Sequence, residues 1–201
     1  MYVYMYISPH FVPIYYVSLR VSVCPSVDHI PAGIGNLPDL TTLYLHCNRL
    51  SGCIPHTLGH CSQLLVLRLE NNQISGTIPD ALCRCIHLKR IVLSNNQLTG
   101  PIPHDIGRLS TLQELILSNN HISGSIPPSL SNCALLTTCM LNNNEFSGVI
   151  TESIAHLSFL TALHLQENRS NTLHGRWFCL HCTPALLFTP ACHLTDYSIC
   201  C

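Results

Sequence analysis

The side chains best suited to chemistry gather near the carboxyl end, where Cys179, His181 and Cys182 lie close together in the chain. With His193 downstream, they offer the sulfur and imidazole ligands that zinc prefers. A structural zinc site ordinarily needs a second, well-spaced pair of ligands, and the sequence supplies none. We therefore predict no metal site in this segment.

Catalytic motifs are absent from the sequence. It contains no Gly-x-Ser-x-Gly elbow, no phosphate-binding loop and no His-Glu-x-x-His pair. Several of the 13 histidines fall at variable turn positions and are expected to be solvated, namely His56, His60, His87 and His104. We predict no catalytic residue and no cofactor, and a formal net charge of -1 without a basic patch argues against a nucleic-acid partner.

Cysteine is frequent, with 13 residues, but its placement favours packing over reactivity. Cys61, Cys85 and Cys133 share one repeat position that other units fill with leucine, and Cys139 replaces a strand leucine. We expect all four to be buried as small apolar residues. Adjacent coils could also bring Cys61 and Cys85 within the Cα separation of ~4.4–6.8 Å that a disulfide needs, so that alternative stays open.

The element that positions these residues is a repeat of 24 residues. Residues 64–79, 88–103 and 112–127 carry the same pattern of leucines, paired asparagines, a glycine and a closing Ile-Pro. A sixth unit opens at Leu160 but breaks at Ser170. The five full units begin at Leu40, Leu64, Leu88, Leu112 and Leu136. A fixed period with this core predicts a leucine-rich repeat solenoid.

Each unit contains a Leu-x-Leu segment, such as Leu67 to Leu69, whose alternation predicts a short strand. Stacked units would place these strands in one parallel sheet, each coil covering the apolar side of the next. One asparagine per unit falls in a single column and is expected to form a buried ladder that satisfies backbone groups: Asn48, Asn72, Asn96, Asn120, Asn144 and Asn168.

Three further positions describe the return path of each coil. The glycine column Gly52, Gly76, Gly100, Gly124 and Gly148 indicates turns with positive φ. The Ile-Pro pairs fit extended backbone, and residues 103–109 predict a short helical turn on the convex side. The expected fold is therefore α/β: a right-handed solenoid with a parallel sheet on its concave face and short helical or 3-10 turns on its convex face.

The consensus pattern L-x-x-L-x-L-x-x-N-x-L-S-G-x-I-P, present from about Ile30 to Asn168, resembles the plant-specific class of leucine-rich repeats. Within that class the chain is similar to part of the ectodomain of a leucine-rich repeat receptor-like serine/threonine kinase. The resemblance implies a peptide, hormone or co-receptor partner, extracellular or plasma-membrane localisation, and signalling through a kinase. The kinase motifs and the family's N-terminal cap with paired cysteines are missing, so a fragment or truncated relative is expected, attached to a membrane only through other parts of the full-length protein.

We divide the chain into a non-repeat leader at 1–27, a repeat domain at 28–169 and an irregular Cys-rich tail at 170–201. The leader is a degenerate signal segment at best, because it lacks a positive start and prolines interrupt its apolar run. The tail is either an irregular cap or translation of a non-coding region. No convincing transmembrane helix is visible in the sequence.

The outward residues of the strands should line the concave face, which is the usual binding surface of a solenoid. The candidate ligand-binding residues there are Tyr44, Arg68, Glu70, Val92, Ile116, Met140 and His164. Val92, Ile116 and Met140 would form an exposed apolar stripe, which either contacts a partner or reflects β-former choices alone. Arg90 and Glu114 should form a cross-strand ion pair.

The leading hypothesis is a non-catalytic module that recognises a protein or peptide. Alternatives are a secreted inhibitor of polygalacturonase type and a truncated product without function. Asn168 begins the only glycosylation sequon and is the glycosylation candidate. A folded sixth coil would enclose its side chain in the buried ladder, whereas a fold that ends earlier would leave it free for modification.

Overall fold

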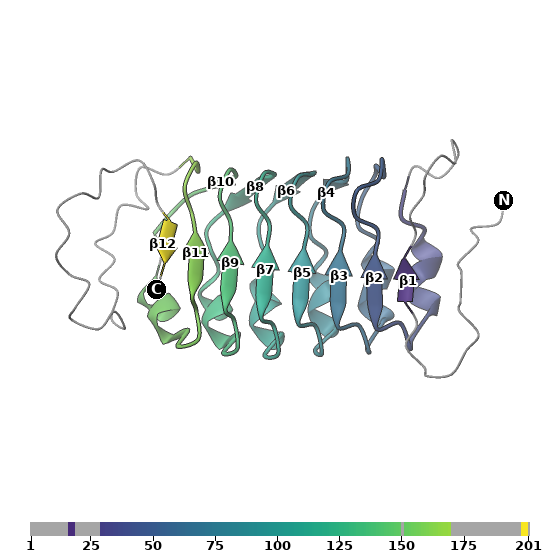
Figure 1. Ribbon diagram of the computed structural model, residues 1–201, viewed down its shortest axis with the longest axis horizontal. Coiled ribbons are helices and arrows are strands. Elements are labelled where there is room, and N and C mark those ends of the chain that lie inside the picture. Colours follow the sequence, from purple (N-terminus) through teal and green to yellow (C-terminus); the bar gives the residue numbers. More distant parts are fainter. Residues whose placement is uncertain (1–15, 19–28, 150, 170–197, 201) are drawn as a thin grey trace.

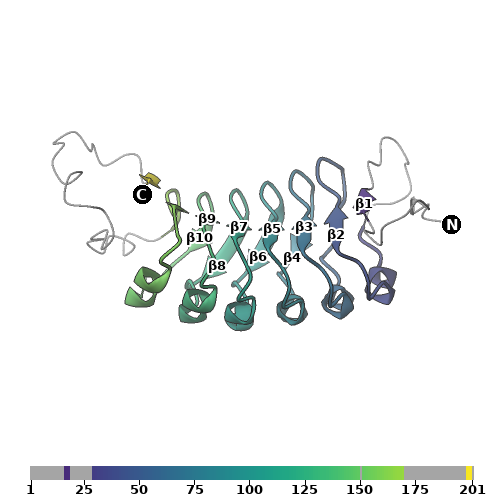
Figure 2. The ribbon, with the colours of Figure 1, turned by 60° about the horizontal axis from the view of Figure 1, so that its bottom comes forward.

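The computed structural model describes residues 16–18, 29–149, 151–169 and 198–200. These residues form a row of coils, each placing one strand in a shared sheet and one 3-10 helix on the opposite side (Figures 1 and 2). The prediction of a solenoid with a parallel sheet and short 3-10 turns is confirmed.

The concave sheet contains one three-residue strand from each coil, and successive strands pair in parallel. These strands are β2 (Thr42–Tyr44), β3 (Val66–Arg68), β5 (Arg90–Val92), β7 (Glu114–Ile116), β9 (Thr138–Met140) and β11 (Ala162–His164). Equivalent residues of neighbouring strands are 24 positions apart, as in the pairing of Leu67 with Ile91. The sequence period therefore sets the register directly.

Two further strands extend this sheet at its ends. β1 (Tyr16–Ser18) pairs in parallel with β2, and β12 (Ser198–Cys200) pairs antiparallel with β11. An unpaired edge strand presents free N–H and C=O groups. β1 and β12 pair with the strands at the two ends of the six-strand row, so neither β2 nor β11 is an edge strand.

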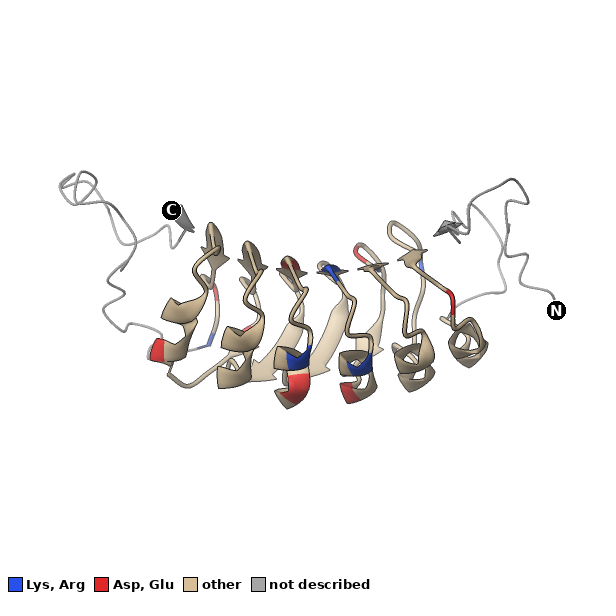
Figure 3. Cartoon of the chain, turned by 90° about the horizontal axis from the view of Figure 1, so that it is seen from below, with Lys and Arg blue, Asp and Glu red and all other residues tan. Residues whose placement is uncertain are grey.

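The opposite side carries one five-residue 3-10 helix per coil, and a proline comes before five of the six. The helices are η1 (Ala32–Asn36), η2 (His56–His60), η3 (Asp80–Arg84), η4 (His104–Arg108), η5 (Pro128–Asn132) and η6 (Glu152–His156). Pro79, for example, lies in extended backbone at φ -70° before η3. Charged residues on this row are few and of both signs (Figure 3).

A second, smaller parallel sheet follows the asparagine turns. It contains β4 (Ser75–Gly76), β6 (Gln97–Gly100), β8 (His121–Gly124) and β10 (Glu145–Phe146), which pair in that order. The five glycines of the repeat column all have positive φ, between 72° and 84°. A left-handed backbone is accessible to glycine without strain, so this column fixes the turn in every coil.

The core lies between the two sheets and the row of 3-10 helices. Its leucine and isoleucine columns are almost fully buried, and Phe146 is the largest enclosed side chain among the described residues. Gly35 permits close packing of neighbouring helices, because a Cβ there would lie 2.3 Å from the Thr57 carbonyl oxygen. The sequence pattern had not indicated this requirement.

Candidate ligand-binding face

The parallel register places six candidate residues in one row across the concave sheet. Tyr44 lies beside Arg68, which lies beside Val92, and the row continues through Ile116, Met140 and His164. Six side chains from six different coils therefore share one line, which a partner in extended conformation could follow.

The apolar stripe within this row is narrower than predicted. Val92 is only 8% exposed, whereas Ile116 and Met140 are half-buried. Arg68 and Ile116, the neighbours of Val92 in the row, carry longer side chains on strands about 4.8 Å away. The prediction that Val92 is exposed is therefore wrong, and the accessible apolar surface centres on Ile116 and Met140.

Arg90 and Glu114 form the predicted cross-strand ion pair, with 3.3 Å between Nε and Oε1. Their side chains are 52% and 29% exposed, so solvent screens the attraction and the pair contributes little to stability. The pair neutralises this part of the face.

A second ion pair was not anticipated from the sequence. The Arg68 guanidinium donates from Nε to Glu70 Oε1 at 2.9 Å, and its Nη2 contacts the same oxygen. The hydrogen bond to Glu70 is the main reason that the pKa of Arg68 is raised. Glu70 itself is buried, and its Oε1 contacts Arg68 two positions earlier, so the Glu70 side chain does not lie open on the concave face. Opposite charges two positions apart on a strand were the available signal, because such side chains share one face.

The asparagine column forms a continuous hydrogen-bonded ladder. The Asn96 amide donates to the Leu69 and Leu93 carbonyls at 3.0 and 3.1 Å, and its Oδ1 accepts from the Ile74 N–H at 3.0 Å. Asn72, Asn120, Asn144 and Asn168 repeat this arrangement one coil at a time. The role of this column is structural, since its amide groups form hydrogen bonds with backbone groups.

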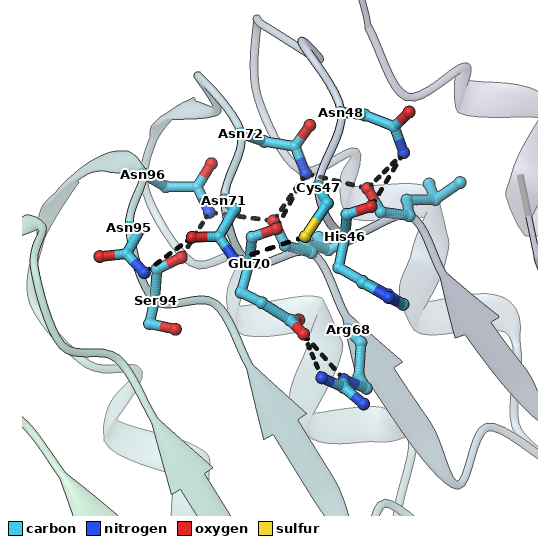
Figure 4. A network of polar contacts seen from close by, with 12 residues as sticks. His46, Cys47, Asn48, Arg68, Glu70, Asn71, Asn72, Ser94, Asn95 and Asn96 are labelled. Carbon is cyan, nitrogen blue, oxygen red and sulfur yellow. Dashed lines mark hydrogen bonds and ion pairs between the residues drawn. The ribbon is translucent and has the colours of Figure 1, made fainter. Parts of the chain in front are cut away.

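A second ladder, which sequence reasoning missed, lies one residue earlier and is exposed (Figure 4). Asn143, Asn119 and Asn95 each donate to the side-chain oxygen of the preceding coil's asparagine, at 2.6, 2.7 and 2.9 Å. The described residues at this position all have positive φ, which asparagine tolerates better than most residues. The doubled Asn-Asn in the repeat was the sequence signal for it.

The cysteines in the helix-side column are buried free thiols. The Cys61, Cys85 and Cys133 thiols donate to the carbonyl oxygens of Ile34, Leu58 and Ile106 at 3.4–3.5 Å. Burial raises the pKa of Cys85 and Cys133 to about 12. The disulfide alternative for Cys61 and Cys85 is not realised, and such thiols are chemically inert.

Within the part of the chain that the structure describes, no group of three or more His, Cys, Asp or Glu residues could hold a metal. Cys179, His181, Cys182 and His193 lie outside the described residues. Among the described residues no helix has the length and apolar character needed to cross a membrane.

Two family models match the chain, both describing the leucine-rich repeat, at residues 38–98 and 111–133. The ectodomain of the receptor kinase SOBIR1 from Arabidopsis thaliana is 34% identical, with a TM-score of 0.59 over 62% of this chain and 68% of that chain. Comparison with curated protein sequences finds no match.

Two longer ectodomains, both from Arabidopsis, are 37% identical and match 71% of this chain. GASSHO1/SCHENGEN3, solved in complex with CASPARIAN STRIP INTEGRITY FACTOR 2, gives a TM-score of 0.70. HAESA, solved with the peptide hormone IDA and the co-receptor SERK1, gives a TM-score of 0.69. The present chain spans only 17% and 24% of these two ectodomains.

Coils, ladders and concave sheet together define a leucine-rich repeat solenoid. The chain belongs to the leucine-rich repeat family, and it resembles a fragment of a plant receptor-kinase ectodomain.

Proposed function

We propose that this chain is a non-catalytic recognition module that binds a protein or peptide ligand along its concave face. The observation that carries the proposal is the aligned central row, in which half-buried Ile116 and Met140 lie between polar ends at Tyr44 and His164. Apolar surface rimmed by polar groups is typical of protein contacts.

The similar receptor kinases support the proposal further, because HAESA was solved with the peptide hormone IDA and GASSHO1/SCHENGEN3 with CASPARIAN STRIP INTEGRITY FACTOR 2. From that likeness we further propose that the chain lies outside the cell, as part of a signalling receptor that also engages a co-receptor. The remainder of such a receptor would supply the membrane anchor and the kinase. The division into leader, repeat domain and tail is part of this proposal.

The proposal is tested by selecting a displayed library of random peptides on the full chain. We expect enriched peptides whose affinity falls at least about tenfold with Ile116→Asp or Met140→Asp, because a charge would interrupt the apolar contact. Ile86→Asp is the matched control, since Ile86 is 47% exposed on the loop after η3, away from the concave sheet. Equal affinity for the wild type and for both concave variants would reject the proposal, as would a library from which nothing is enriched.

A further inference from the structure

Unpaired polar atoms concentrate in one row of the concave face. In the described part of the chain, the buried side-chain nitrogen and oxygen atoms without a hydrogen-bond partner are Thr41 Oγ1, His46 Nδ1, Glu70 Oε2 and Gln166 Oε1. The last three occupy the same repeat position, two residues after the central row. His46 and Glu70 belong to neighbouring coils, since the N–H of Cys47 donates to the Glu70 carbonyl at 2.8 Å.

Only one of the two oxygens of the Glu70 carboxylate has a hydrogen-bond partner. Both donating nitrogens of Arg68 contact Oε1, and no described donor reaches Oε2. The Glu70 side chain is 8% exposed, so water screens it poorly, and an unpaired oxygen there is costly. Oε2 is enclosed, so a partner would reach it only by moving the partly exposed Arg68 side chain aside, and a hydrogen-bond donor placed there would bind favourably.

The His46 ring provides the second unpaired group. It packs edge-on against Tyr44, with ring centroids 6.2 Å apart and an interplanar angle of 88°. Figure 4 shows the imidazole of His46 and the carboxylate of Glu70 both on the Arg68 side of the asparagine turns. Nδ1 donates in one tautomer and accepts in the other, so it can adapt to the group that arrives.

Charge restricts what this place can accept. An anionic group would be repelled by the Glu70 carboxylate, and a cationic group by the Arg68 guanidinium, which already compensates Glu70. A neutral donor meets neither penalty. A hydroxyl can donate to Oε2 while accepting from Nδ1–H, and a carboxamide can donate to both atoms.

We propose that His46 and Glu70 form a polar subsite that takes a neutral hydrogen-bond donor, a hydroxyl or carboxamide side chain, from the bound peptide, with Arg68 as its cover. This inference rests on the proposed function, because it assumes a peptide along the same face. It adds a specificity: one ligand position should favour Ser, Thr, Asn or Gln over both charged and apolar residues.

The test uses peptides enriched on the full chain by the selection described above. In the wild type, changing the neutral polar residue of the peptide to alanine should weaken binding at least about fivefold. His46→Phe keeps a ring against Tyr44 but removes Nδ1, and Glu70→Gln removes the carboxylate. Against either variant the same alanine change should cost less than about twofold, whereas Glu114→Gln, at the exposed ion pair, should retain the full effect.

Two outcomes would overturn the subsite. The alanine change could leave wild-type affinity unchanged at every position, which would mean that water alone fills the place. The loss could also be equal in the wild type and both variants, which would locate the polar contact elsewhere. Both outcomes are distinct from failure of the proposed function, in which Ile116→Asp and Met140→Asp leave binding unaffected or no peptide is enriched.

Discussion

The side-chain oxygen of Asn96 accepts a hydrogen bond from the backbone N–H of Ile74, 22 residues earlier, at 3.0 Å. Its amide nitrogen donates to carbonyls of its own coil and of the preceding one. One side chain therefore links two neighbouring coils at the turn that follows their concave strands. The same bond recurs between Asn120 and Leu98 and between Asn144 and Ile122, so the fold depends on a column of such links.

Replacing Asn96 should be far more damaging than replacing its neighbour Asn95. Asn96→Ala leaves the Ile74 N–H and buried carbonyls without hydrogen-bond partners. Each such group costs about 1–3 kcal/mol, so we expect the free energy of unfolding to fall by at least about 2 kcal/mol. Asn95→Gly keeps the left-handed backbone while removing an exposed amide, and should cost less than about 1 kcal/mol. Urea unfolding followed by circular dichroism measures both. Similar losses of stability in the two variants would show that the buried ladder does not stabilise the fold more than the exposed ladder does.

Two glycines in the same 3-10 helix should respond oppositely to alanine. A Cβ on Gly35 would lie 2.3 Å from the Thr57 carbonyl oxygen, whereas one on Gly33 meets nothing within 4 Å. Gly35→Ala should therefore cost about 1–3 kcal/mol by overpacking. Gly33→Ala should be neutral or slightly stabilising, because it restricts the unfolded chain. Thermal midpoints that fall equally in both variants would contradict the packing argument.

Thiol reactivity should divide the described cysteines into two groups. Cys47 and Cys53 are exposed and should be alkylated in the native protein. The buried cysteines should react only after unfolding: Cys61, Cys83, Cys85, Cys133 and Cys139. Peptide mass spectrometry after iodoacetamide treatment, with and without urea, maps each site. If Cys61 and Cys85 remained unmodified in urea until a reductant was added, they would be disulfide-bonded and the free-thiol arrangement would be wrong.

Alkaline pH should weaken the fold through the same buried thiols. Burial raises the pKa of Cys133 and Cys139 from 9.0 to about 12 in the folded chain. Below pH 9 the thiols are neutral in both states and their contribution is fully present; between pH 9 and 12 the unfolded state ionises first, so the free energy of unfolding falls. Cys133→Ala should lose less stability than the wild type between about pH 8 and about pH 11, measured by urea unfolding. An unchanged pH slope would contradict this.

Glycosylation of Asn168 should be incompatible with closure of the last coil. Its amide nitrogen donates to the Leu141 and Leu165 carbonyls at 3.1 and 2.8 Å, and its oxygen accepts from the Phe146 N–H at 3.0 Å. A glycan on that nitrogen would remove donors from the ladder, so folded chain secreted from a eukaryotic host should be unmodified at this residue. His121→Ser creates a control sequon at exposed Asn119, which should be occupied. A glycan on Asn168 with an unchanged thermal midpoint would refute the prediction.

The sequence by itself determined the architecture. A strict period of 24 residues sets which positions meet, because coils stacked in register bring each residue beside its equivalent in the next unit. Periodicity thus predicted the concave strands, the buried asparagines and the turn glycines without knowledge of any contact. It also placed Arg90 beside Glu114, and the ion pair between them is confirmed.

Only the tertiary structure decided how much of each side chain remains accessible. Val92 and Glu70 face outward in the pattern, yet Val92 lies between longer neighbours and Glu70 lies beneath Arg68. The tight approach at Gly35 is likewise a matter of how closely two helices pack. Periodicity specifies which residues are neighbours, but exposure and unpaired polar atoms depend on side-chain length and conformation across three adjacent coils, which a one-dimensional repeat does not encode.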